Sequence, residues 1–275
     1  MELDIIRAIQ SIHCGFLDLL FQGITIMAEQ YFLIVVMLAV YWIFDKDCGE
    51  YMIYSMLTGM TLNNGIKNIF KLPRPIGEEG VRTLRAETAT GHSFPSGHSQ
   101  TSASASWSLA ISKKKKWLYI VAVIYPLLVG VSRLYLGVHY PKDVVVGLAL
   151  GIGVSYLCFW LYKKVRNRVL LYFLSFAATL PFLFAGVSKD FVKSSGMYLG
   201  FAVAMFIDKK FLHYEFDVPM PKRILRFVLG LVFTGIVYLP MKLLFPDEFI
   251  FAFLRYFILI VMVLGVYPIT FKWIK

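Results

Sequence analysis

Long apolar runs recur along almost all of this 275-residue chain, and they restrict its fold to one that suits a membrane. Hydrophobic residues make up 58% of the sequence and its mean hydropathy is +0.67, which is more apolar than an ordinary soluble domain. Runs of roughly 15–22 residues match helices that cross a hydrocarbon core of about 30 Å. We therefore predict an all-α, multi-pass transmembrane helical bundle with spans near 9–28, 30–45, 51–70, 97–112, 117–136, 143–162, 169–187, 194–208, 224–244 and 249–271.

Two of these spans are irregular. Polar residues interrupt the run 9–28, so this segment could lie in the membrane interface instead of crossing. The run 194–208 ends at Asp208 and is short for a full crossing.

Basic residues gather at the ends of the apolar runs. The net charge of +11 is therefore a topology signal, and we expect no nucleic-acid partner. Placing Lys113–Lys116 in the cytoplasm also places the basic stretch 163–168 and both termini there. We expect no cleavable signal peptide, because Met1 to Asp4 is acidic rather than basic. The lean loops favour a bacterial inner membrane.

Three polar clusters then fall at the extracytoplasmic ends of spans three to six, where charged groups are costly and need a reason. They are Lys67-x6-Arg74-Pro75, Pro95-Ser96-Gly97-His98 and Ser132-Arg133-x5-His139-x3-Asp143. A single His or Arg at the end of a span usually caps a helix or fixes topology. Three tightly spaced clusters on one face favour a site instead.

The cationic members of these clusters suit a phosphate. Lys67 and Arg74 lie about two helical turns apart, and the prolines on both sides of Arg74 end the helix. With Arg133 they offer one ammonium and two guanidinium groups, which bind phosphoryl oxygens through charge-assisted hydrogen bonds.

The second cluster predicts the start of a helix. Ser96 is a plausible N-cap, and Gly97 lets an anion approach the first free N–H groups of that helix. His98, in the first turn, is placed to protonate a leaving alkoxide.

The third cluster pairs His139 with a carboxylate. Pro141 suits the first position of a helix, which leaves His139 just outside it and Asp143 in its first turn. Asp143 could accept the N–H of one ring nitrogen of His139, so that the other nitrogen is free to attack.

Together the clusters resemble the signature of the type 2 phosphatidic acid phosphatase family, and all three match without a change of residue or spacing. The resemblance covers about residues 51–162. It implies a six-helix membrane core that removes phosphate without metal or cofactor, with His139 as the nucleophile, Asp143 orienting it and His98 as the general acid. It also implies that the phosphoryl oxygens are held by Lys67, Arg74, Ser96, Gly97 and Arg133.

The sequence continues for about a hundred residues beyond the part that resembles the family. We predict a core at 1–165 and an extension at 166–275 with about four more membrane helices, which could wall the entry path or form a homodimer face. The loop 76–94 could act as a lid or as a simple connector.

The substrates we expect are lipid phosphates such as phosphatidic acid, phosphatidylglycerophosphate, polyprenyl phosphates or diphosphates and sphingoid-base phosphates. A phosphotransferase that uses a second lipid or sugar as acceptor remains open as an alternative. A lipid or anion transporter is a third hypothesis, which the clustering of cations at one face disfavours.

Overall fold

The computed structural model describes residues 1–212, 214 and 216–274, and within them the chain is helical with no β-strand. The predicted all-α class is confirmed. In chain order the α-helices are α1 (Glu2–Gln10), α2 (Gly15–Ile26), α3 (Gln30–Ala39), α4 (Lys46–Phe70), α5 (Gly97–Lys113), α6 (Lys116–Tyr135), α7 (Pro141–Lys164), α8 (Arg168–Ala177), α9 (Lys189–Phe211), α10 (Met220–Leu244) and α11 (Phe249–Ile260). Shorter turns of other helix types lie at Val40–Phe44, Ala86–Thr88, Leu180–Ala185, Val261–Val266 and Tyr267–Trp273.

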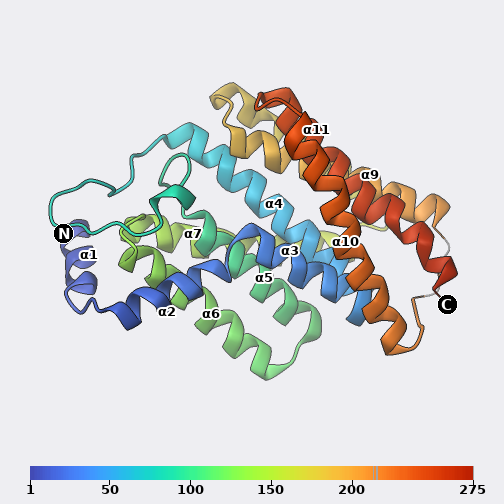
Figure 1. Cartoon of the computed structure of the whole chain (residues 1–275), viewed down its shortest axis with the longest axis horizontal. Coiled ribbons are helices and arrows are strands. Elements are labelled where there is room, and N and C mark those ends of the chain that lie inside the picture. Colours follow the sequence, from blue (N-terminus) through green and yellow to red (C-terminus); the bar gives the residue numbers. More distant parts are fainter. Residues whose placement is uncertain (213, 215, 275) are drawn as a thin grey trace.

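Helix α4 runs through the middle of the molecule and packs against α5, α7 and α9 (Figure 1). It begins where the Asp45 carboxylate accepts a hydrogen bond from the amide of Cys48, a side-chain cap for the first turn. It ends at Lys71, whose left-handed backbone (φ 50°) stops the helix just before Pro73. Lys67 is therefore carried by the last turn of α4, and Arg74 by the segment that leaves it.

Helices α5 and α7 approach each other closely because α7 carries glycine at the contact. A Cβ atom on Gly147 would lie 2.5 Å from the carbonyl oxygen of Ser96, and one on Gly151 would lie 2.5 Å from that of Gln100. Small residues at a four-residue spacing allow such close packing in membrane bundles. This contact brings the start of α5 beside the start of α7, and thus His98 near His139.

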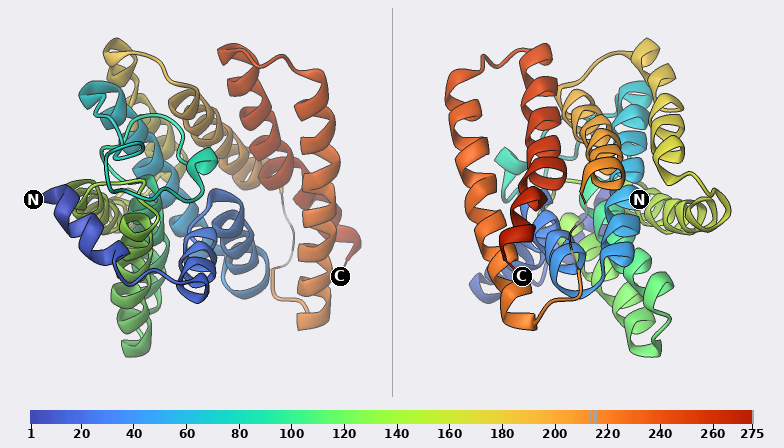
Figure 2. Two further views of the ribbon diagram at one scale, coloured as in Figure 1. Left: turned by 60° about the vertical axis from the view of Figure 1, so that its left-hand side comes forward. Right: turned by 90° about the vertical axis from the view of Figure 1, so that its right-hand side faces the viewer.

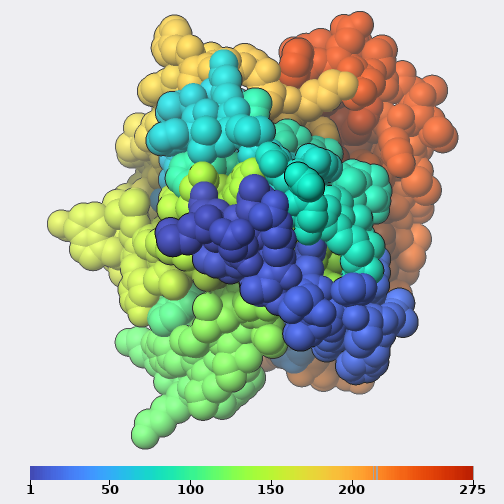
Figure 3. All heavy atoms as spheres, turned by 90° about the vertical axis from the view of Figure 1, so that its left-hand side faces the viewer, coloured from blue at the N-terminus to red at the C-terminus, as the bar shows by residue number. Residues whose placement is uncertain are grey.

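The loop between α4 and α5 is fixed to the N-terminal helices. The amide group of Gln10 donates hydrogen bonds to the carbonyl oxygens of Arg82 (2.6 Å) and Tyr135 (2.8 Å). Arg82 also forms an ion pair with Asp18 of α2. Figure 3 shows α1, α2 and this loop spread over one face of the molecule. The loop is thus a docked cover rather than a loose connector.

The C-terminal helices pack against the side of α4. Helix α9 lies between α4 and α11, and α10 and α11 stand side by side along one flank (Figure 2). Near the C-terminus, the rings of Tyr267 and Phe271 pack on Trp42, with centroid distances of 5.3 and 6.0 Å. The division into a core at 1–165 and an extension at 166–275 stays a prediction.

Among the residues that the structure describes, five helical segments are long and apolar enough to cross a membrane, and a sixth crossing results if a bent pair counts as one span. The five are Lys116–Tyr135, Pro141–Lys164, Arg168–Ala185, Met220–Leu244 and Phe249–Trp273, and the pair is Gly15–Ile26 with Gln30–Phe44, bent by 53°. These helices support a multi-pass membrane protein. Helices α4, α5 and α9 occupy predicted spans but carry many buried polar side chains.

Three details of the predicted spans are wrong. The run 9–28 is broken at residues 11–14, and α2, with 12 residues, is only about 18 Å long, too short to cross alone. Helix α9 has 23 residues rather than a short span, because it already begins at Lys189 and buries Phe191 and Val192 in its first turns.

The third correction concerns the termini, which lie at opposite ends of the bundle. Glu2 pairs with Lys142 at the start of α7 (2.8 Å), on the same face as the polar clusters. Phe271 packs beside the start of α4, at the other face. The expectation of both termini on one face fails because α1 lies on the surface and α2 and α3 form one bent pair.

Candidate active site

The three polar clusters meet around one cavity of about 340 Å³. Six of the eight predicted site residues line this active-site cavity: Lys67, Arg74, Gly97, His98, Arg133 and His139. Ser96 and Asp143 are fully buried behind them. The expectation that the clusters share one face is therefore confirmed by the geometry, because α4 and α6 end where α5 and α7 begin.

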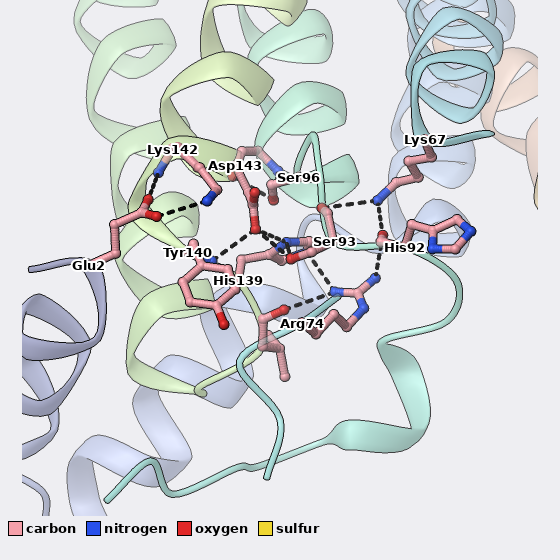
Figure 4. Close-up of polar contacts among 12 residues, drawn as sticks. Glu2, Lys67, Arg74, His92, Ser93, Ser96, His139, Tyr140, Lys142 and Asp143 are labelled. Atoms are coloured by element: carbon pink, nitrogen blue, oxygen red, sulfur yellow. Dashed lines mark hydrogen bonds and ion pairs between the residues drawn. The ribbon is translucent and has the colours of Figure 1, made fainter. Parts of the chain in front are cut away.

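Backbone carbonyl groups hold the first two cations in place (Figure 4). The Lys67 ammonium donates hydrogen bonds to the carbonyl oxygens of His92 (2.6 Å) and Ser93 (3.2 Å). The Arg74 guanidinium donates to the carbonyl oxygens of Thr90 (2.7 Å), Gly91 (3.1 Å) and Val138 (2.9 Å), among others. The loop therefore fixes both cations with neutral acceptors, and their positive charge is not cancelled.

Arg133 and His98 face the cavity with unused hydrogen-bonding groups. Arg133 is 1% exposed and donates from Nη1 to the Thr25 hydroxyl at 2.8 Å. Within the described residues, its Nε and Nη2 and the Nε2 of His98 have no hydrogen-bond partner. Buried groups of this kind are costly unless something binds them. A phosphate in the cavity would supply acceptors for all three.

His139 is held at both ring nitrogens. Its Nδ1 lies 3.4 Å from Oδ2 of Asp143 and 3.3 Å from the Ser93 hydroxyl. Its Nε2 lies 2.9 Å from Nη1 of Arg74, which can only donate. These contacts assign the proton to Nδ1 and the lone pair to Nε2, where it accepts a hydrogen bond from Arg74.

Electrostatics around His139 keep its ring neutral. Burial, reinforced by the positive charges of Arg74 and Arg133, holds the pKa of His139 well below the ordinary imidazole value. Burial also lowers the pKa of Arg74, to about 10, so this guanidinium remains charged at neutral pH. A neutral imidazole beside a charged guanidinium is a nucleophile poised next to an anion-binding group.

Ser96 acts at the start of α5, as its position in the sequence predicts. Its hydroxyl accepts hydrogen bonds from the amide (3.4 Å) and the hydroxyl (2.9 Å) of Ser99, so it caps the helix. Its own amide donates to the carbonyl oxygen of Asp143 at 2.9 Å and links α5 to α7. Its hydroxyl is engaged in the cap, while Gly97 and His98 face the cavity.

Ser93 is the main residue that the motif analysis missed. It is fully buried, and its hydroxyl donates a short hydrogen bond to Oδ2 of Asp143 while lying beside His139. The Asp143 carboxylate also accepts the amide N–H of Tyr140 at 2.9 Å. The signal available in the sequence was only a hydroxyl three residues before Ser96, which is common in loops.

The C-terminal helices also contribute to the cavity wall. Asp190 and Lys193 of α9 and Tyr256 of α11 line it. The Asp190 carboxylate accepts a hydrogen bond from the Thr90 hydroxyl at 3.0 Å, which ties α9 to the loop. That the extension walls the entry path of the substrate stays a prediction.

The balance of charge in the cavity is positive. The two carboxylates that line it have their own cations: Glu29 pairs with Arg85 (2.6 Å) and Asp190 with Lys193 (3.5 Å). In the described part of the chain, no carboxylate lies within ion-pairing distance of Lys67, Arg74 or Arg133. Three cations thus remain for an anionic ligand.

Comparison with known proteins identifies the family. The model of the PAP2 superfamily matches residues 50–167, and a second model, the transmembrane extension of PAP2 superfamily phosphatases, matches residues 192–275. Undecaprenyl-diphosphatase BcrC of Bacillus subtilis is 30% identical over 62% of this chain and 88% of its own length. The chain belongs to the PAP2 superfamily. The family predicted from the three motifs is confirmed.

Other PAP2 relatives match over a smaller share of their length. An undecaprenyl-diphosphatase of Sulfolobus acidocaldarius is 30% identical over 41% of this chain and 54% of its own. Phosphatidylglycerophosphatase B of Bacillus subtilis is 33% identical over 35% of this chain and 55% of its own. The chain spans about half the length of these two relatives.

Two solved structures of the PAP2 superfamily share the fold. LpxE of Aquifex aeolicus has a TM-score of 0.52 at 27% identity, covering 57% of this chain and 94% of that protein. A transmembrane PAP2-type phosphatidylglycerolphosphate phosphatase of Bacillus subtilis has a TM-score of 0.51 at 30% identity, covering 60% and 85%. Their coverage leaves a large part of this chain outside the shared fold.

Proposed function

We propose that this protein is an integral-membrane lipid phosphate phosphatase that works through a phosphohistidine on His139, without a metal or cofactor. One observation carries the proposal: three cations that lack carboxylate partners, the buried Lys67 and Arg133 and the partly buried Arg74, surround a neutral, oriented imidazole. The names of the relatives support a lipid as substrate, since they include phosphatases of undecaprenyl diphosphate and phosphatidylglycerophosphate.

The first chemical step uses the Nε2 lone pair of His139, which Arg74 releases when its guanidinium donates to the phosphate instead. Its Nε2 attacks phosphorus, the bond from phosphorus to the ester oxygen breaks, and His98 gives a proton to the leaving oxygen. Lys67, Arg74 and Arg133, with the first amides of α5, hold the phosphoryl oxygens as negative charge redistributes in the transition state. Asp143 stabilises the positive charge that develops on the His139 ring.

The second step releases phosphate. A water molecule attacks the phosphorus of the phosphohistidine, and His98, now deprotonated, accepts a proton from that water. The bond between phosphorus and Nε2 breaks, which restores His139 and the starting protonation of His98.

We place this reaction at the extracytoplasmic face of a cell membrane, and a bacterial inner membrane suits the lean loops. The cytoplasmic face would then carry the basic Lys113–Lys116 segment, in line with the positive-inside rule.

Phosphate release from a panel of lipid phosphates, measured with EDTA present, tests the proposal. We expect wild type to release phosphate and His139→Ala to release none. Hydrolysis by His139→Ala at the wild-type rate would contradict the histidine mechanism. A phosphoenzyme that turns over only when an alcohol acceptor is added would assign the protein to the phosphotransferases instead.

A further inference from the structure

A second cavity, of about 350 Å³, lies beside the active-site cavity and has a different character. Its wall is formed by α3 and α4 on one side and by α9, α10, α11 and the turn Val261–Val266 on the other. The side chains that line it are mostly aliphatic or thioether groups, such as Leu38, Met56, Leu231 and Leu259. We call it the apolar groove.

The apolar groove adjoins the active-site cavity. Gln30, Tyr31 and Tyr256 line both of them. The hydroxyl of Tyr31 lies 3.3 Å from that of Tyr238, whose ring centroid is 6.4 Å from that of Tyr256. Tyrosine has an apolar ring and a polar tip, and such side chains suit the level where a lipid changes from headgroup to chain.

We propose that the apolar groove holds one hydrocarbon chain of the substrate while its phosphate lies among Lys67, Arg74 and Arg133. This inference rests on the proposed function. Along α11 and the following turn the groove extends from Tyr256 to Leu264, about 12 Å at the helical rise. This length is close to one leaflet of hydrocarbon, about 15 Å.

Much of the groove belongs to the C-terminal helices. Its far wall comes from α9, α10, α11 and the turn that follows, which lie outside the segment matched by the first family model, residues 50–167. The preference of this protein for a substrate's hydrocarbon chain is therefore set in large part by residues outside segment 50–167.

Gly235 offers a direct way to fill the groove. It lines the groove, and a Cβ atom there would have no neighbour within 4 Å. Gly235→Phe should therefore block the groove without straining the backbone. Gly153 of α7 is exposed and equally free of neighbours, so Gly153→Phe is the matched control.

The experiment compares butyl phosphate with hexadecyl phosphate in detergent micelles. We expect Gly235→Phe to lose more than about tenfold in kcat/KM for hexadecyl phosphate, as if about two methylenes no longer entered the groove. Its activity on butyl phosphate, which also reports folding, should stay at the wild-type level, and Gly153→Phe should match wild type on both. Equal activity of wild type and Gly235→Phe on hexadecyl phosphate would overturn the inference.

A labelling measurement separates this inference from the proposed function. Hexadecyl phosphate with a diazirine at the end of its chain is photolysed with the His139→Ala protein, which needs no catalysis, and the labelled peptides are mapped. Label within 231–238 and 256–264 that excess hexadecyl phosphate removes supports the groove. Label only outside these two segments, or label within them that excess hexadecyl phosphate does not remove, overturns it. Absence of phosphate release by wild type would instead reject the proposed function alone.

Discussion

Uncharged hydrogen-bond acceptors hold the cations of this site. Their positive charge therefore remains available to bind an anion. Lys67 and Arg74 donate hydrogen bonds to carbonyl oxygens of the loop and of the segment before α7. These bonds hold both side chains in position without neutralising their positive charge. A carboxylate partner would have fixed them equally well but would have repelled a phosphate. The buried Arg133 is likewise held by an uncharged group, because it donates a hydrogen bond to the Thr25 hydroxyl.

Ser93 is predicted to position the Asp143 carboxylate. Ser93→Ala removes its hydroxyl from the pair formed by Asp143 and His139, which loosens the nucleophile rather than the phosphate-binding cations. We expect kcat to fall by about tenfold, within the range for a buried group that loses a hydrogen bond, with KM nearly unchanged. Ser93→Thr keeps the hydroxyl and should recover most of the rate. An unchanged kcat in Ser93→Ala would contradict this role.

The pH dependence of kcat/KM tests the environment of His139. Its pKa is lowered, so the ring stays unprotonated as the pH falls below the ordinary imidazole value of about 6.5, and activity persists there. Arg74→Ala removes a positive charge and part of the burial, and both changes raise the pKa of His139. The acid limb should therefore move to higher pH, while Arg74→Lys should leave it near that of wild type. The same limb position in wild type and Arg74→Ala would contradict this account.

Residue patterns predicted much of the site. The motif spacing predicts Lys67, Arg74, His98, Arg133 and His139 together, and all five line one cavity. Ser93 and Asp190 were not predicted, since each reaches the site through a contact with a distant segment. Spacing along one helix or turn reports local geometry, whereas such contacts depend on how helices pack.

At the scale of helices, the contact between α5 and α7 controls the site. Gly151→Leu would force a side chain against the carbonyl oxygen of Gln100, which is 2.5 Å from the expected Cβ position. We expect the free energy of unfolding to fall by about 1–3 kcal/mol, seen as a lower thermal midpoint in detergent. Gly153→Leu, two residues away with open space at its Cβ, should leave the midpoint unchanged. Equal midpoints for both variants would contradict the close packing.

Helix boundaries followed from hydropathy where the run was uniform. The predicted spans 117–136 and 143–162 correspond closely to α6 and α7, whereas the span 97–112 matches the polar helix α5 because Ser96 and Gly97 mark its start. The prediction failed at 9–28, where polar residues break the run, and at 194–208, where a longer helix is polar at its start. Hydropathy reports how readily side chains leave water for an apolar medium, so it does not identify helical residues whose polar groups are buried against other helices.

At the scale of the whole molecule, the N-terminus and the site share one face. Cys14 is exposed at the start of α2, while the other two cysteines are buried. In intact cells, a membrane-impermeant maleimide should therefore label Cys14 from outside if the site is extracytoplasmic. A Cys14→Ser, Lys114→Cys variant, with its thiol in the exposed turn between α5 and α6, should be labelled only after the cells are opened. The reverse pattern would place the site in the cytoplasm.

The most direct test of the account is the identity of the phosphorylated residue. Wild-type protein turning over a lipid phosphate is quenched in alkali, digested and mapped by mass spectrometry, with His139→Ala as the control. We expect acid-labile phosphate on the peptide that contains His139 and none on the variant. Phosphate on another residue, or an undiminished phosphopeptide in His139→Ala, would contradict it.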